Sequence, residues 1–494
     1  MLKKLTRVIN NTPTIQSRFQ EKFEAILGEG TKMKNDMLSV FYKEDILSNL
    51  DRNDTPIKLH NDLIYIWNGV YWESVESPKM KRFIVTYIRK RGLIKHTSSI
   101  VVDGVFKDIR TELDGYDYKK DMNKQFINML NGTLLIGGSE VKLIPHAKEN
   151  HLDYVLDFEY NQEAVNKKWQ SFLNDVIPNS ETQRTLQQVI GNLLIRGLKI
   201  EVLPFLYGTG GNGKSVVLEV LTGLFGRNNV TTYSLTKIST DEKVRARIAD
   251  GKIMNLSSEN NMGNVNVDVA KNYSSNEPLD ARLNYGNPFE IYDYAKFLGN
   301  VNKLNVMDGE RTEAIARRQI IIPFSKTISA EKRDINIHKK ILKDKAGLLN
   351  WIVEGIRSVI DNESIYISRE VKALLKDYHE ETNPVALLIK EHDYNLLSEK
   401  TSKKHFATLR NLYTEYKDFV TEIGVGKLSR TNFKNDLLSI KGVREYKYNN
   451  KICFNLSKLV SETKSYKTIL EENRDNLNKA QIEVLERKAK EEVF

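Results

Sequence analysis

One short stretch of the chain combines glycine, lysine and serine in an order that can bind phosphate. Residues 208–215, Gly-Thr-Gly-Gly-Asn-Gly-Lys-Ser, fit the phosphate-loop pattern in full. Glycines let backbone N–H groups close around phosphate oxygens, and the amino end of the following helix adds its dipole. Lys214 is expected to neutralise the β- and γ-phosphates of ATP, and the Ser215 hydroxyl to ligate Mg²⁺. The predicted ATP-binding residues are Gly208, Thr209, Gly210, Gly211, Asn212, Gly213, Lys214, Ser215 and Val216.

Polar and basic residues next to later apolar runs could complete a hydrolytic site. Glu259 ends KIMNLSSE, where a carboxylate could act near Mg²⁺ and the attacking water, although glutamates at strand ends are common. Asn300 ends AKFLGN and Asn302 follows, so either amide could orient that water. Arg317 and Arg318 precede QIIIPF. One arginine there would usually be a surface residue, but two after a polar sensor suit a finger that reaches a neighbouring subunit's γ-phosphate.

The elements that position these residues follow from the hydrophobic pattern. Between residues 200 and 360, short apolar runs alternate with helical stretches, which predicts an α/β sheet domain. The predicted strands are 202–207, 252–257, 295–300 and 318–324. Upstream, Asn68-Gly69 and Asn131-Gly132 are strong hairpin signals within a mixed α+β region.

Six segments are predicted along the chain. They are an N-terminal helix and linker (1–34), a domain preceding the motor (35–199), the ATPase domain (200–360), a linker (361–383), a winged-helix domain (384–460) and a charged C-terminal helix (461–494).

The predicted winged-helix domain carries much of the positive charge. The protein has 494 residues and a net charge of +10, and residues 401–460 hold 12 Lys or Arg against 5 Asp or Glu. The order helix, short helix and hairpin would place Arg430, Asn432 and Lys434 on a recognition helix and Lys447 and Lys451 on a wing. A solvated basic face that binds nothing is the alternative.

Composition narrows the class of protein. The residue composition is globular, no apolar run reaches the ~20 residues of a membrane helix, and no signal core is present, so we expect a cytoplasmic protein without a membrane partner. Cys453 is the only cysteine, which excludes an intramolecular disulfide.

Taken together, these motifs resemble superfamily 3 hexameric DNA helicases, in the branch of phages, satellite elements and poxvirus-type primase-helicases. The matching sequences are GTGGNGKS (208–215), MNLSSE (254–259), FLGN (297–300) and RRQIIIPF (317–324). In size and arrangement the chain is similar to the self-loading replication helicases of staphylococcal pathogenicity islands. About 200 residues precede the motor and match the domain before it, so we expect no primase domain there.

The resemblance implies an AAA+ type core, a homo-hexameric ring and ATP with Mg²⁺ as cofactors. It assigns catalytic roles to Lys214, Glu259, Asn300, Arg317 and Arg318, with Arg318 favoured as the finger, and metal binding to Ser215 and Glu259. Arg282, Tyr285 and Asn287 would lie on or beside a hairpin that grips DNA in the ring's channel. The implied partners are single-stranded DNA, origin duplex DNA, a separately encoded primase and host replication proteins.

Two departures from the family pattern and two other functions stay open. Ser258 stands where many relatives have an acidic residue, and Asn300-Val-Asn-Lys-Leu replaces Asn-x-Leu-Pro, so Asn300 and Asn302 both remain sensor candidates. The chain could instead be an ATPase that binds and melts an origin without unwinding, or a packaging-type ATPase that translocates on duplex DNA.

Overall fold

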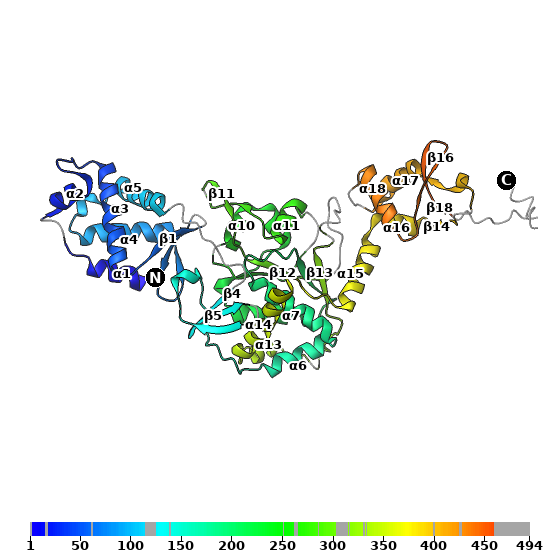
Figure 1. Cartoon of the computed structure of the whole chain (residues 1–494), viewed down its shortest axis with the longest axis horizontal. Helices are drawn as coiled ribbons and strands as arrows, with labels where there is room; N and C mark the ends of the chain where they lie inside the picture. The colour runs from blue at the N-terminus through cyan, green and yellow to red at the C-terminus, as the bar shows by residue number, and fades with distance from the viewer. Residues whose placement is uncertain are drawn as a thin grey trace, which may run out of the picture. The chain divides into compact units, whose positions relative to one another are not determined.

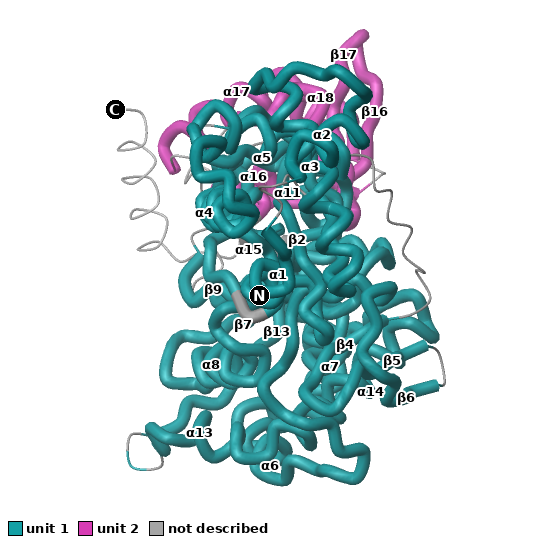
Figure 2. The backbone as a smooth tube through the Cα atoms, turned by 90° about the vertical axis from the view of Figure 1, so that its left-hand side faces the viewer, with its two compact units in different colours: residues 1–307, 312–375 teal, residues 308–311, 376–494 magenta. Residues whose placement is uncertain are grey.

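The computed structural model describes most of the chain, which divides into two units (Figure 2). Unit 1 comprises residues 1–307 and 312–375, and unit 2 comprises residues 308–311 and 376–494. The described residues are 2–14, 18–60, 63–113, 125–137, 140–249, 251–260, 265–284, 286–302, 315, 317–329, 331, 333–398, 401–423 and 427–458. The predicted C-terminal helix 461–494 and Tyr285 lie outside these residues.

Unit 1 begins with a helical lobe around a small antiparallel sheet (Figure 1). Its elements are α1 (Leu2–Asn11), α2 (Phe19–Leu27), α3 (Asn35–Arg52), β1 (Ile57–His60), β2 (Leu63–Trp67), β3 (Trp72–Val75), α4 (Ser77–Lys90) and α5 (Ser99–Leu113). The N-terminal segment forms two helices rather than one, because Pro13 lacks the N–H that a continuing helix needs. Leu5 and Phe23 are buried in the same core as α3, so the first two helices pack with the lobe that follows them.

A second antiparallel sheet and two helices lead to the central sheet. They are β4 (Gln125–Met129), β5 (Gly132–Gly137), β6 (Glu140–Ile144), α6 (Lys167–Val176) and α7 (Ser180–Leu194). Both predicted hairpins are confirmed, since Trp67 pairs with Trp72 and Met129 with Gly132. Gly132 is required at its turn, because it has φ +147° and an added Cβ would lie 2.7 Å from the Ile144 carbonyl oxygen.

The centre of unit 1 is a five-stranded parallel sheet in the order β13-β7-β12-β9-β8. The strands are β7 (Leu203–Tyr207), β8 (Val230–Thr231), β9 (Met254–Ser257), β12 (Lys296–Val301) and β13 (Gln319–Pro323). The α/β class with a parallel sheet is therefore confirmed. Four strands correspond to the four predicted apolar runs, whereas β8 is only two residues long and gave no such signal.

Apolar side chains cover both faces of this sheet, as parallel strands require. On β7, Phe205 packs into one core and Leu206 into the other, because successive side chains point to opposite faces. The first core includes residues of α6, α7, α8 (Lys214–Phe225), α13 (Ile337–Ile341) and α14 (Lys345–Asn362). The second includes residues of α9 (Leu235–Thr240), α10 (Glu242–Ala249), α11 (Val267–Ser274), β10 (Leu279–Arg282) and β11 (Pro288–Ile291). Figure 1 shows α10 and α11 on one side of β12 and β13, and α7 and α14 on the other.

Unit 2 has its own core and a helix, helix, hairpin order. After α15 (Arg369–Thr382), it contains α16 (Pro384–Glu391), β14 (Tyr394–Leu396), β15 (Ala407–Thr408), α17 (Leu409–Glu422), α18 (Arg430–Ser439), β16 (Glu445–Tyr448), β17 (Lys451–Phe454) and β18 (Leu456–Lys458). Phe433 and Phe454 are fully buried in its core. The β16–β17 turn has φ +47° at Asn449 and +59° at Asn450, the left-handed conformation that asparagine tolerates in tight hairpins.

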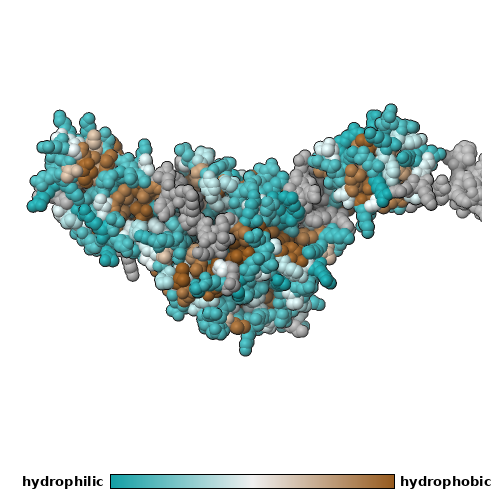
Figure 3. Space-filling model, in the orientation of Figure 1, coloured by the Kyte–Doolittle hydropathy of each residue, from teal (hydrophilic) through white to brown (hydrophobic). Residues whose placement is uncertain are grey.

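The visible surface of the described residues is largely hydrophilic (Figure 3). Within that described part of the chain, no helix is both long enough and apolar enough to cross a bilayer.

Candidate nucleotide-binding site

The glycine-rich segment 208–213 connects the carboxyl end of β7 to the first turn of α8, whose first residue is Lys214. Its glycines are needed for space as well as for backbone conformation. An added Cβ at Gly208 would lie 1.8 Å from Asn212 Nδ2, and one at Gly213 would lie 2.9 Å from Val176 Cγ1. Gly210, Gly211 and Gly213 all have positive φ, which L side chains rarely adopt. The loop is therefore held in one compact shape at the amino end of a helix.

Lys214 lies at the base of this loop with only 4% of its surface exposed. Its Nζ donates hydrogen bonds to the Gly208 carbonyl oxygen, at 2.5 Å, and to Asn212 Oδ1, at 2.9 Å. No carboxylate among the described residues forms an ion pair with it, and burial lowers the pKa of its ammonium. A nearly buried cation without a carboxylate partner favours an anionic ligand nearby.

Three of the five predicted catalytic residues, Lys214, Glu259 and Asn300, line one cleft of about 870 Å³ at the carboxyl edge of the sheet. Ser258 and Glu259 follow β9, while Asn300 and Asn302 lie at and just after the end of β12. The cleft is lined by these four residues, by residues 210–216 of the loop and helix, and by residues of α6 and of the segment after β13. The sheet order explains this gathering, because β7 lies directly beside β12, which lies beside β9.

Asn300 carries a polar atom that nothing in the described chain satisfies. Its side chain is 3% exposed, and its Oδ1 is buried without a hydrogen-bond partner. A buried acceptor left unpaired costs about 1–3 kcal/mol, so a water molecule or a ligand is expected to bond it. With the glycine loop, the Ser215 hydroxyl and the Glu259 carboxylate, the cleft contains donors and acceptors that suit ATP and Mg²⁺.

Several cleft residues were missed by the sequence analysis. Lys168, Phe172 and Asp175 come from α6, whose only sequence signal was an amphipathic helix. Lys326 and Arg333 come from the segment after β13, whose local sequence matches no phosphate-binding pattern. Nothing in the spacing of these five residues could have placed them near residue 214.

The predicted arginine pair lies away from this cleft, at the amino end of β13. The first residue of that strand, Gln319, pairs with Leu203, the first residue of β7, whereas the phosphate loop follows the other end of β7. Arg318 is 8% exposed and bonds Glu201 at 2.5 Å, whereas Arg317 is 66% exposed and lies 3.6 Å from the same carboxylate. Arg317 is thus the more exposed of the two arginines, and which of them acts as the finger stays a prediction.

The predicted DNA-binding residues of unit 1 belong to the β10–β11 hairpin. Arg282 ends β10, and its Nε donates to the Gly286 carbonyl oxygen at 3.0 Å, while Asn287 directly precedes β11. The described part of the hairpin tip therefore includes Arg282 and Asn287.

The predicted DNA-binding residues of unit 2 lie on α18 and on the β16–β17 hairpin. Arg430, Lys447 and Lys451 are exposed, and Asn432 is half-buried. Lys434 forms a 2.8 Å ion pair with Glu445, which partly satisfies its charge within the unit.

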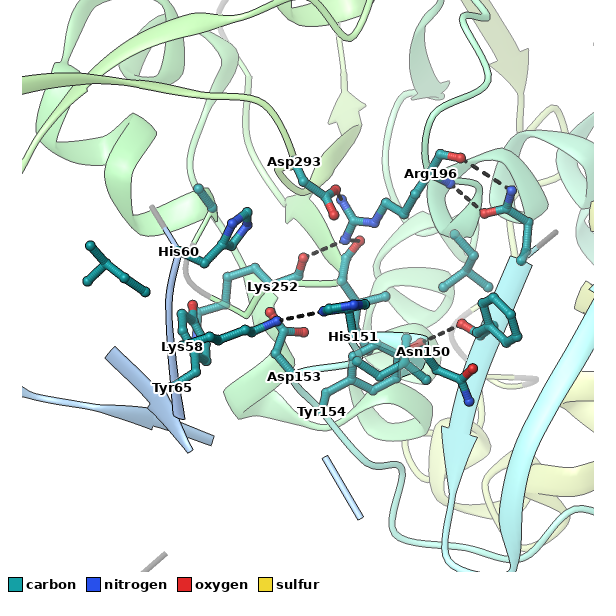
Figure 4. Close-up of a pocket in the computed structure, with 17 residues that line it drawn as sticks. Lys58, His60, Tyr65, Asn150, His151, Asp153, Tyr154, Arg196, Lys252 and Asp293 are labelled. Atoms are coloured by element: carbon teal, nitrogen blue, oxygen red, sulfur yellow. Dashed lines mark hydrogen bonds and ion pairs between the residues drawn. The ribbon is translucent and has the colours of Figure 1, made fainter. Parts of the chain in front are cut away.

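A second charged pocket, of about 70 Å³, lies where the N-terminal lobe meets the central domain of unit 1 (Figure 4). Lys58 of β1 points toward His151, with 3.2 Å between Nζ and Nδ1, and lies 4.5 Å from the centre of the Trp72 ring. Burial lowers the pKa of Lys58 to about 8. Burial and the nearby Asp293 carboxylate raise the pKa of Asp153 to about 6. These groups respond to pH near neutrality and lie outside the nucleotide cleft.

Two family models match the chain in separate segments. Residues 50–178 match the family described as D5 N terminal like, and residues 206–318 match a family of unknown function (DUF5906). The first match runs from the end of α3 to the end of α6. The second covers the phosphate loop, Glu259 and Asn300 and ends at the arginine pair.

Solved structures give more distant likenesses. Two apo structures of the NrS-1 C-terminal region are each 12% identical to this chain. The first match has a TM-score of 0.44 and covers 84% of this chain and 98% of the other. The second has a TM-score of 0.45 and covers 86% of this chain and 99% of the other. An active helicase described as SCCmec type IV Cch is also 12% identical, covers 78% of this chain and 73% of its own, and has a TM-score of 0.31. We draw no functional conclusion from likenesses at this level.

Proposed function

We propose that this chain is an ATP-dependent DNA helicase that initiates replication of a mobile genetic element. The observation that carries the proposal is the cleft at the sheet edge, where the phosphate loop, Glu259 and Asn300 lie together beside uncompensated positive charge. The D5 N terminal like match over residues 50–178 supports a replicative helicase class, and the sequence resemblance supports the superfamily 3 assignment with an AAA+ core.

Within the cleft, each residue has a role that its position suits. The loop N–H groups and Lys214 bind the phosphates, and Ser215 with Glu259 holds Mg²⁺, which supplies charge neutralisation when bound. Glu259 also orients and deprotonates the attacking water, and the Asn300 amide positions it, using the acceptor that is otherwise unsatisfied. Asn302 remains the alternative sensor, since it lines the same cleft.

The active form in this proposal is a homo-hexameric ring. The amino end of β13 is the wrong end of the strand for Arg317 to act on its own subunit's nucleotide, because about five residues at ~3.3 Å each separate it from the loop. An exposed guanidinium there suits contact with the γ-phosphate held by a neighbouring subunit. Hydrolysis removes that contact, which changes the subunit interface and moves the β10–β11 hairpin along DNA.

DNA binding in this proposal has two parts. The hairpin residues Arg282 and Asn287 grip phosphates in the channel, and such contacts weaken steeply with salt. Unit 2 acts as a winged-helix domain that recognises origin duplex through α18 and the exposed wing lysines Lys447 and Lys451. A separately encoded primase and host replication proteins would complete the replication machinery.

A strand-displacement assay on forked and origin-containing DNA tests the proposal. We expect ATP-dependent displacement by the wild type and none by Lys214→Ala. Origin binding and ATPase activity without displacement would instead identify an origin-melting ATPase. Movement on duplex DNA that ignores a bulky lesion on either single strand would identify a packaging-type translocase.

A further inference from the structure

Three hydrogen bonds connect the segment after β13 to the phosphate loop and to Tyr207, the last residue of β7. Phe324 N donates to the Tyr207 carbonyl oxygen at 2.8 Å, and Asn212 Nδ2 donates to the Phe324 carbonyl oxygen at 3.1 Å. Further along, Ile328 N donates to the Gly211 carbonyl oxygen at 3.0 Å. These bonds hold residues 324–328 against the loop, so Lys326 keeps a defined position beside the cleft.

Two cations of this segment line the cleft. Arg333 comes closest to the loop, since its Nη2 lies 2.8 Å from where a Cβ on Gly211 would be. Lys326 lines the same cleft. No carboxylate in the described ranges forms an ion pair with either one. The adjacent Asp334 bonds Lys340 instead, at 2.7 Å, and that contact lowers the pKa of its carboxyl.

We propose that Arg333, assisted by Lys326, binds the terminal phosphate of the nucleotide held by its own subunit and so makes the cleft selective for triphosphate over diphosphate. This inference rests on the proposed ATPase function. Lys214 is bonded at the base of the loop, and Arg333 approaches the loop from the segment after β13. A planar guanidinium can donate two hydrogen bonds to one phosphate, and it remains charged at every working pH.

The position of Arg333 also gives β13 a part in communication between subunits. The strand carries the exposed Arg317 at its amino end and leads to Arg333 beyond its carboxyl end. The Leu203 N–H donates to the Arg318 carbonyl oxygen at 2.6 Å, so the amino end of β13 is bonded to β7. One strand therefore joins the residue that senses its own subunit's terminal phosphate to the residue that faces the neighbour.

Equilibrium titration of the full chain with a fluorescent non-hydrolysable ATP analogue and with fluorescent ADP tests this role. We expect Arg333→Ala to weaken binding of the ATP analogue about 10- to 100-fold, the range of a charge-assisted hydrogen bond, and binding of ADP less than about threefold. Arg333→Lys should recover part of the loss. Arg227→Ala is the matched control, because this exposed arginine follows the far end of α8.

The outcomes separate this inference from the proposed function. If the wild type prefers the ATP analogue and Arg333→Ala keeps the same preference, the inference is wrong and the ATPase proposal stands. An equal loss for both nucleotides would also overturn it, since Arg333 would then not read the terminal phosphate. If the wild type binds neither nucleotide, or Lys214→Ala binds both like the wild type, the proposed function itself fails. If Arg333→Ala does not fold by circular dichroism, Arg333→Lys and Lys326→Ala provide the same comparison.

Discussion

Two buried cations in unit 1 have opposite surroundings. Arg91, in the N-terminal lobe, donates to both carboxylate oxygens of Asp45 at 2.7 and 2.8 Å, and both side chains are 1% exposed. The Tyr87 hydroxyl donates to the same carboxylate at 2.9 Å. Lys214 is almost as buried, but its partners are a carbonyl and an amide oxygen.

The charge of Arg91 is paired within the protein and stabilises the fold, whereas the charge of Lys214 has no carboxylate partner in the described chain and is available for a ligand. Arg91 is paired within the lobe with Asp45, whose carboxylate Lys22 also contacts, and removing Asp45 would leave the buried guanidinium unpaired. Lys214 keeps a net positive charge next to a cleft, where an anion can neutralise it. The arginine pair repeats the contrast on a smaller scale, because Arg318 is paired with Glu201 and buried while Arg317 is exposed.

The largest effect on ATP turnover should come from substitution of Arg317, the exposed arginine of the pair 317–318. We expect Arg317→Ala to lower ATP turnover by roughly 10³-fold or more, as removal of an arginine finger does, with nucleotide binding and melting temperature nearly unchanged. Steady-state ATPase assays at concentrations that assemble the ring measure this. Arg318→Ala is the comparison, and it should lower the melting temperature because it leaves Glu201 without its 2.5 Å partner. Wild-type turnover by Arg317→Ala would refute the finger assignment.

The next largest effect is expected when the Arg91–Asp45 pair of the N-terminal lobe is broken. Asp45→Ala should lower the free energy of unfolding by about 3–5 kcal/mol, because Arg91 stays buried without its carboxylate. Lys214→Ala should change the stability of the nucleotide-free protein by less than about 1 kcal/mol or increase it. Chemical denaturation of both variants measures the contrast. Equal destabilisation by the two substitutions would contradict the division into structural and ligand-binding charge.

The pocket of about 70 Å³ that Lys58 and Asp153 line provides a test by pH. The folded pKa of Asp153, about 6, lies above the ordinary value of 3.8, so the folded state binds this proton more tightly and loses stability as pH rises from about 4 to 6. The charged or titratable groups that line the pocket with it are Lys58, His60, Tyr65, His151, Tyr154, Arg196, Lys252 and Asp293.

Asp153→Asn should therefore gain stability relative to wild type as pH rises, by roughly 1–3 kcal/mol between pH 4 and pH 7. Thermal melts across this range, with Asp361→Asn as an exposed control, measure the gain. A difference between variant and wild type that does not change with pH would contradict the assigned pKa.

The smallest effect is expected on the wing of unit 2. The double variant Lys447→Ala/Lys451→Ala should weaken binding of origin duplex DNA about three- to tenfold. The slope of log binding constant against log salt concentration should become less steep by up to roughly two, because each lysine that contacts a phosphate releases about one counterion. Fluorescence anisotropy at several salt concentrations measures both quantities, and ATPase activity should stay unchanged. An unchanged salt slope would favour the solvated basic face.

Local features were predicted well from the sequence at positions where the backbone conformation admits few residue types. Asn-Gly at 68–69 and at 131–132 predicted turns that the structure contains, since glycine tolerates positive φ. Four of the five central strands were predicted because parallel strands are continuous apolar runs. The first helix ends at Asn11, and the role of the nearby Pro13 in stopping it was not recognised from the sequence.

The candidate site was predictable only in the parts that a local pattern encodes. The loop 208–215 has its own signature. Asn300 lies at the end of β12, which neighbours β7, and Glu259 follows β9, the next strand beyond β12. Arg333 and Phe172 reach the same cleft through tertiary packing, which no spacing along the chain expresses. The difference in exposure between Arg317 and Arg318 likewise depends on Glu201, which lies just before β7 and contacts the arginines just before β13.

The central claim is that the uncompensated charge at Lys214 binds ATP and that its hydrolysis serves DNA. The most direct test is ATP hydrolysis measured with and without single-stranded DNA for the wild type, Lys214→Ala and the control Arg227→Ala. We predict that DNA stimulates hydrolysis in the wild type and in Arg227→Ala, and that Lys214→Ala loses at least about 100-fold under both conditions. Hydrolysis by Lys214→Ala at the wild-type rate would contradict the account.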